Sequence, residues 1–166
     1  FTGFHRIEQL LWEDDTLAGT GPLCAGLVRN EKQLHKLVRQ AQYNPLEMAS
    51  GATELINEAA TSKISGEEER YSNTDLPDFE ANIDGAMEIV TLLQPYLRQT
   101  VPSMVPEIQQ RHAAVTTLLA KYRATPGYDG TGFVDYSTVL DSQRRQLAAA
   151  VNALAEALSK ISTHVG

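Results

Sequence analysis

The last part of the chain carries the pattern that most restricts the fold. Between residues 140 and 165, two rows of apolar residues repeat at seven-residue spacing. The first row is Leu140, Leu147, Leu154 and Ile161, and the second is Val151, Leu158 and Val165. Two neighbouring rows of this kind put the apolar side chains on one side of an α-helix, which is typical of a helix packed inside a bundle. The pattern therefore predicts a long bundle helix at the end of the chain.

Helical periodicity also runs through the rest of the sequence. Apolar residues spaced by three and four predict helices from about residue 4, over 23–41, over 79–93 and over 108–122. Asn44, Pro45 and Glu47 form a helix-start signature before another helix, and Gly66 suits the end of that helix. Pro77 fits the first turn of the following helix, and Pro95 predicts that this helix kinks or stops there. No strand alternation is present, so we predict an all-α antiparallel bundle of the four-helix type, forming one domain over residues 1–166.

Charge and cysteine content exclude some classes of protein. The net charge is −7, which argues against a nucleic-acid partner because binding phosphates needs a basic surface. The lone Cys24 cannot form an internal disulfide, and we predict that it is a small core residue. No apolar run in these residues is long enough to span a bilayer, and we see no charged-then-apolar pattern of a signal peptide among them, which leaves a removed signal or anchor open. The first residue is not methionine, which we interpret as processing or trimming of the chain.

The first predicted helix carries His5 and Glu8, three positions apart. Residues at this spacing project from the same side of a helix, so an imidazole nitrogen and a carboxylate oxygen can reach one cation. Two protein ligands rarely hold a metal ion, so a site needs a third ligand from elsewhere in the chain. The alternative is ordinary surface polarity on an exposed helix.

Further acidic and histidine residues allow two interpretations. Glu67, Glu68 and Glu69 follow Gly66 directly, where a solvated charge run is the usual explanation, yet one of them could supply the missing carboxylate. Asp75, Asp78 and Asp84 form a second carboxylate set, whose first two members are explained by the start of a helix. The remaining histidines have no partners at ligand spacing and are predicted on polar surfaces: His35, His112 and His164.

Two stretches resemble a known family. The segments "GFHRIEQLLW" and "KISGEEERYSNTDLPDFEANIDGA" are similar to motifs of the imelysin-like family, which is also catalogued as a metallopeptidase family, and within it to iron-uptake lipoproteins of the EfeO and EfeM type. The resemblance extends from residue 1 into the last predicted helix. It implies an all-helical fold of paired bundles and a metal site built on His5 and Glu8. It also implies that a glutamate of the Gly-Glu-Glu segment completes the site, with Glu68 as the best match and Glu67 as the alternative.

The chain departs from the family pattern at several places. The resemblance implies a further aspartate ligand on a helix before the His-x-x-Glu segment, and this chain starts after it. We therefore expect a fragment that lacks upstream helices, and such a fragment would expose apolar surface that favours self-association. Asn73 stands where relatives often have histidine, and Pro77 where they often have tryptophan. Asparagine is a poor metal ligand, so a second site at position 73 is not expected.

The resemblance implies an extracytoplasmic iron-binding component of a bacterial uptake system, in the periplasm or as a cell-surface lipoprotein. His5 would supply nitrogen, and Glu8 and Glu68 would supply hard oxygens. The ligand chemistry suits iron, zinc or manganese alike, and the resemblance implies iron first, with zinc, manganese, copper or calcium as alternatives. The expected partners are a membrane iron permease and a peroxidase-like protein of the same system.

Three other functions stay open. A metal-dependent peptidase would need a general base, for which Glu67 or Glu69 is available, but no protease motif is present and no catalytic residue is assigned. An acidic-polysaccharide binder would need a bridging cation or a basic patch, for instance around Arg144 and Arg145. The chain could also be a structural bundle whose metal ligands are vestigial.

Overall fold

The computed structural model describes residues 1–165, which are mostly α-helical. The α-helices are α1 (Phe4–Trp12), α2 (Thr20–Gln40), α3 (Pro45–Thr61), α4 (Asp75–Thr100), α5 (Met104–Leu119) and α6 (Asp141–Val165). Four short 3₁₀ turns connect them: η1 (Lys63–Ser65), η2 (Ala120–Tyr122), η3 (Tyr128–Gly130) and η4 (Tyr136–Thr138). Within the described residues no strand forms beyond one isolated bridge between Arg123 and Phe133. The predicted all-α fold class is confirmed.

Contacts divide the chain into two compact units. Unit 1 comprises Phe1–Gln42 together with Glu68–Asn73, and unit 2 comprises Tyr43–Glu67 together with the chain from Thr74 onwards. The interpretation of residues 1–166 as one domain stays a prediction. No helix within residues 1–165 combines the length and the apolar character needed to cross a bilayer.

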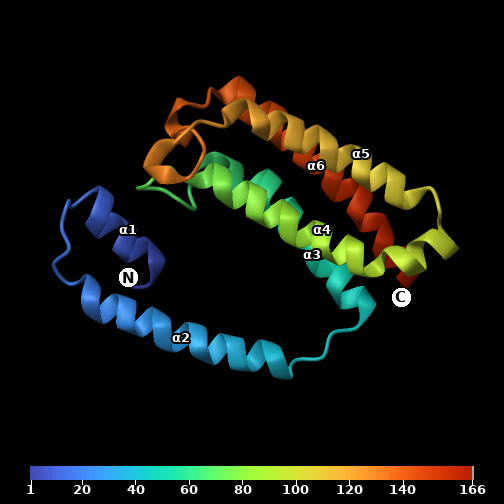
Figure 1. The fold of residues 1–166 in the computed structure, drawn as a ribbon, viewed down its shortest axis with the longest axis horizontal. Helices are drawn as coiled ribbons and strands as arrows, with labels where there is room; N and C mark the ends of the chain where they lie inside the picture. The colour runs from blue at the N-terminus through green and yellow to red at the C-terminus, as the bar shows by residue number, and fades with distance from the viewer. Residues whose placement is uncertain (166) are drawn as a thin grey trace. The chain divides into compact units, whose positions relative to one another are not determined.

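Unit 2 is an antiparallel four-helix bundle. Figure 1 shows α3, α4, α5 and α6 running alternately in opposite directions, and each helix packs on the next, with α6 closing the ring against α3. The centre of the bundle contains residues with no solvent exposure from every helix, including Ile56, Leu76, Ile108, Leu154 and Leu158. Burial of these side chains holds the four helices together.

The start of α3 follows the sequence signature. The Asn44 side chain accepts a hydrogen bond from the Glu47 backbone N–H at 2.9 Å, and the Glu47 carboxylate accepts one from the Asn44 N–H at 3.0 Å. Pro45 occupies the first helical position, where the absent N–H is not needed. The predicted capping box is therefore confirmed.

Helix α6 buries most of the two predicted rows. The buried members are Leu147, Val151, Leu154, Leu158 and Ile161, while Val165 is partly buried against the core. Leu140 differs from the prediction, because it precedes the helix and is 63% exposed. The heptad spacing continues into the connecting loop by one residue, but the helix that would bury that residue has not yet begun.

Helix α4 continues through Pro95 to Thr100, so Pro95 does not stop the helix, and the alternative that it kinks the helix stays a prediction. Pro95 lies on an exposed face of α4. There, water can satisfy the backbone carbonyl that loses its N–H partner. Asp75 and Asp78 lie in the first turn of α4, where negative charge is favoured by the helix dipole.

The 3₁₀ turn η1 is anchored inside unit 2. The Tyr136 hydroxyl donates to the Ile64 carbonyl at 2.8 Å, and the Arg144 guanidinium donates to the Ser65 carbonyl at 3.1 Å. Arg144 also donates to the carbonyls of Tyr136 and Val139 and stacks over the Tyr136 ring. Gly66 ends η1 with a φ of 81°, and a Cβ built there would lie 3.2 Å from the Tyr136 ring.

The Gly66→Ala substitution is expected to destabilise unit 2. The left-handed backbone costs a residue with a Cβ about 1–2 kcal/mol, and the contact with the Tyr136 ring adds to this cost. Gly85→Ala is the matched control, because Gly85 lies inside α4 with open space around it. That change should stabilise the helix by roughly 0.5–1 kcal/mol. Urea denaturation should give opposite signs for the two variants, and equal effects would contradict this explanation.

Unit 1 contains α1, α2 and the segment Glu68–Asn73. In α1 the buried residues are Glu8 and Leu10, whereas α2 buries none of its residues. Apolar side chains on α2, such as Leu37, are more than half exposed (55%). Cys24 is exposed as well, so its prediction as a core residue is wrong. The cause is that no described element covers the side of α2 that carries Cys24.

Candidate metal site

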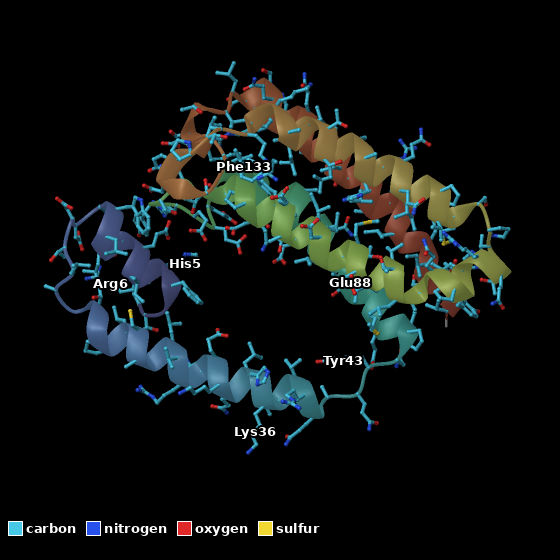
Figure 2. All side chains as sticks on the ribbon, in the orientation of Figure 1. His5, Arg6, Lys36, Tyr43, Glu88 and Phe133 are labelled. Carbon is cyan, nitrogen blue, oxygen red and sulfur yellow. The ribbon has the colours of Figure 1, made fainter. Side chains whose placement is uncertain are left out.

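Helix α1 brings His5 and Glu8 together as the three-residue spacing predicts. His5 Nδ1 lies 3.3 Å from Glu8 Oε2. Gly3 precedes the helix with φ 82° and ψ −159°, a backbone region that is essentially restricted to glycine. Gly3 therefore allows the chain to enter α1 two residues before His5. Figure 2 shows His5 and Arg6 as neighbours on this helix.

Glu8 is the buried member of the pair. It is only 6% exposed, and its carboxylate connects α1 to the segment Glu68–Asn73 of the same unit. Oε1 accepts hydrogen bonds from the Tyr71 N–H at 2.9 Å, the Ser72 N–H at 2.8 Å and the Ser72 hydroxyl at 2.8 Å. These three bonds compensate the cost of burying a charged group. The two sequence motifs are thus in direct contact.

The backbone of the Glu68–Asn73 segment explains why it can bind a carboxylate. The Asn73 N–H donates to the Glu69 carbonyl at 2.8 Å, which closes one helical turn. The N–H groups of Tyr71 and Ser72 lie inside this turn and point to Glu8 instead. Asn73 ends the turn with a φ of 56°, a left-handed conformation in which asparagine and histidine are both enriched. Asn73 therefore suits the backbone conformation that ends this turn.

Opposing effects set the pKa of Glu8. Burial raises it, but the hydrogen bonds from the Ser72 and Tyr71 backbone, the Ser72 hydroxyl and His5 together lower the pKa below its ordinary value. Glu8 is therefore a carboxylate at neutral pH. A site with an ionised carboxylate beside an imidazole is ready to bind a cation without first losing a carboxyl proton.

The donor chemistry of His5 and Glu8 fits a metal ion. Metal–nitrogen and metal–oxygen bonds of about 2.0–2.2 Å allow two donors 3.3 Å apart to reach one ion. The His5 side chain is 51% exposed, so an ion could approach from solvent. Across residues 1–165, however, no group of three or more His, Cys, Asp or Glu side chains is arranged to hold a metal ion. His5 and Glu8 thus supply two potential metal donors, which is fewer than a protein metal site usually has.

The three consecutive glutamates differ in their surroundings. Glu67 is exposed and belongs to unit 2, whereas Glu68 and Glu69 are partly buried in unit 1. One carboxyl oxygen of Glu68, Oε2, is enclosed by protein. Glu69 Oε2 lies 3.0 Å from the Ser72 hydroxyl, which also contacts Glu8. The assignment of Glu68 as the third ligand stays a prediction.

Sequence reasoning did not select Ser72, which is 1% exposed and makes two contacts with Glu8. Its only signal was its place inside the second motif, since serine has no characteristic spacing relative to His5 and Glu8. Tyr71 contributes to the site through its backbone N–H, which donates to Glu8.

The remaining acidic and histidine candidates differ in their exposure. Asp75 is 2% exposed, Asp78 is partly buried and Asp84 is exposed. His35 and His164 are exposed, as predicted. His112 differs, because it is half-buried in α5 and its Nε2 atom is enclosed.

Comparison with known proteins places the chain in a family. Residues 1–161 match the Imelysin family, so almost the whole sequence is covered by the match. The matched residues include the helices of the bundle, the His5–Glu8 pair and the Glu68–Asn73 segment that the pair contacts. The chain belongs to the Imelysin family.

Individual relatives in the family carry names related to iron. The chain is 40% identical over its full length to the iron uptake system component EfeM of Pseudomonas syringae pv. syringae, where it covers 57% of that protein. It is 39% identical to the iron uptake system component EfeO of Escherichia coli (strain K12) and to that of Shigella flexneri, with 43% of each covered. The chain therefore spans about half the length of these curated relatives.

Proposed function

We propose that this chain is part of an extracytoplasmic protein that captures metal ions, iron first, for a bacterial iron-uptake system. The observation that carries the proposal is the pairing of a half-exposed His5 imidazole with the buried, ionised Glu8 carboxylate, 3.3 Å apart. The names of the relatives, which are iron uptake system components, support iron as the cargo.

Each ligand has a distinct role in the proposed site. His5 supplies a neutral nitrogen donor that is accessible to solvent, and Glu8 supplies a fixed negative oxygen. Glu68 supplies a second carboxylate from the turn that already contacts Glu8. A mixed nitrogen and carboxylate set of this kind binds first-row metals with open positions for water, which favours reversible capture over permanent retention.

The proposed uptake role implies partners and a location. An extracytoplasmic protein that binds iron reversibly would pass the ion to a membrane iron permease, with a peroxidase-like protein of the same system as a second partner. The exposed apolar side chains of α2 also support self-association of the chain. The polysaccharide alternative receives less support at Arg144, because its guanidinium nitrogens donate to the backbone carbonyls of Val139, Ser65 and Tyr136.

Anaerobic calorimetric titration with Fe²⁺ tests the proposal. The unmodified chain is expected to show one dominant site, and His5→Ala should abolish the binding heat because one of the few protein donors is removed. Glu68→Gln should weaken binding at least tenfold if this residue is the third ligand.

Glu67→Gln is the matched control, since it makes the same change of charge at an exposed neighbour. It should leave the affinity within about threefold of the unmodified chain, because the interaction of exposed charges with the ion is screened by solvent and salt. If His5→Ala binds Fe²⁺ like the unmodified chain, the proposed site is wrong. If Glu67→Gln or Glu69→Gln weakens binding and Glu68→Gln does not, the third ligand has to be reassigned to that glutamate.

A further inference from the structure

We infer that Ser72 is a positioning residue that makes Glu8 a one-oxygen ligand. In this arrangement Oε1 of Glu8 accepts hydrogen bonds from the protein, and Oε2 of Glu8 binds the metal ion. The inference rests on the proposed function, and it adds a residue to the site that lies outside the predicted ligand set.

The hydrogen bonds on Oε1 leave no room for a cation. A carboxylate oxygen has two lone pairs, and Oε1 already accepts three bonds of 2.8–2.9 Å from Tyr71 and Ser72. A metal ion at Oε1 would have to displace buried donors, whose loss of partners is costly. Glu8 is therefore not expected to bind an ion through both oxygens.

The other oxygen of Glu8 has a different environment. Oε2 faces His5 Nδ1 at 3.3 Å, on the side where the imidazole is half exposed. With Oε1 fixed, the carboxylate cannot rotate, so Oε2 stays on the side of His5. Folding therefore brings the nitrogen donor and the oxygen donor together before an ion binds. The binding free energy then does not include the entropic cost of ordering these two side chains.

Ser72 contributes more than its backbone N–H to this arrangement. Its hydroxyl lies 2.8 Å from Glu8 Oε1 and 3.0 Å from Glu69 Oε2, and the residue is 1% exposed. A hydroxyl has one proton and donates to one acceptor at a time. The shorter contact favours Glu8 as the acceptor of this proton.

Titration of Fe²⁺ into the Ser72→Ala variant measures this contribution. Groups that orient a metal ligand typically change affinity by 10–100-fold, and two backbone donors remain here, so we expect a loss of about tenfold. Ser72→Thr keeps the hydroxyl and should bind within about threefold of the unmodified chain. Ser159→Ala is the control, because this α6 hydroxyl bonds only to a carbonyl of its own helix, that of Glu156, among the contacts described.

A second measurement needs no metal ion. Amide protons that donate to a carboxylate resonate downfield, so Glu8→Gln should shift the Tyr71 and Ser72 amide signals upfield in proton–nitrogen correlation spectra, while the Asn73 signal changes little. Unshifted Tyr71 and Ser72 signals would overturn the inference even if Ser72→Ala failed to fold.

The outcomes separate the inference from the proposed function. If the unmodified chain binds Fe²⁺ and Ser72→Ala binds it equally well, Ser72 does not position the ligand, although the site itself stands. If Ser72→Ala loses about tenfold and Ser72→Thr recovers it, the inference is supported. If the unmodified chain does not bind Fe²⁺, the proposed function fails, and the assignment of Oε2 to an ion fails with it.

Discussion

Replacing Glu8 by alanine is expected to release the Glu68–Asn73 segment from α1. The variant removes the acceptor of three hydrogen bonds, and the Tyr71 and Ser72 N–H groups lose their partner. Buried donors without a partner cost about 1–3 kcal/mol each, and water entering the gap recovers part of this, so we expect a local loss of roughly 2–4 kcal/mol. Amide hydrogen exchange of Tyr71 and Ser72 should then accelerate roughly 30- to 1,000-fold.

The control for this prediction is Glu13→Ala. Glu13 also accepts a side-chain hydrogen bond near the end of α1, from Gln9 at 2.8 Å, but the contact is exposed. Exchange at Tyr71 and Ser72 should be unchanged in this variant. Equal exchange in Glu8→Ala and the unmodified chain would show that the contact does not hold the segment.

The same attachment should depend on pH. Because the folded pKa of Glu8 is lowered, its stabilising effect is fully present above the ordinary pKa of a glutamate and is lost as the pH falls through the lowered value. Protection of the Tyr71 and Ser72 amides should therefore decrease in acid, after correction for the intrinsic exchange rate. Glu8→Ala should remove this acid dependence.

Leu158→Ala is expected to cause a large loss of stability in unit 2. Leu158 is completely buried in α6, and removing such a side chain costs about 2–5 kcal/mol through lost burial and the cavity left behind. Leu140→Ala removes the same atoms at a position that is 63% exposed, so it should change stability by less than about 0.5 kcal/mol. Urea denaturation monitored by circular dichroism measures both.

A comparable loss in the two leucine variants would contradict the observed boundary of α6. The heptad pattern alone treats the two positions as equivalent members of repeating rows, whereas the structure separates them by the start of the helix at Asp141. The pair of variants therefore tests whether burial, rather than sequence spacing, determines the contribution of each leucine.

Local signals predicted the helices well, because those signals act over three or four residues. The capping box of Asn44 and Glu47 and the buried rows of α6 follow directly from side-chain spacing along one helix. The predictions that differ from the structure concern the burial of side chains. Cys24 has the character of a core residue yet is exposed, since burial depends on which element packs over it and not on the residue alone.

In the candidate site, too, local features could be predicted from the sequence and long-range contacts could not. The proximity of His5 and Glu8 could be predicted from one helical turn, whereas Ser72 lies 64 residues from Glu8 in the sequence. Neither residue type nor spacing indicates that a backbone turn ending at Asn73 would present two N–H groups to a buried carboxylate. The family resemblance indicated that the two motifs belong together, but it pointed to glutamate side chains and not to these backbone donors.

The sequence by itself determined the helical fold class, the helix that begins at Pro45 and the pairing of His5 with Glu8, because each depends on residues only a few positions apart in the chain. Only the tertiary structure decided which oxygen of Glu8 is held by Tyr71 and Ser72 and which faces His5. Long-range hydrogen bonds of this kind depend on how distant segments pack, and chain folding sets that geometry without leaving a local repeat in the sequence.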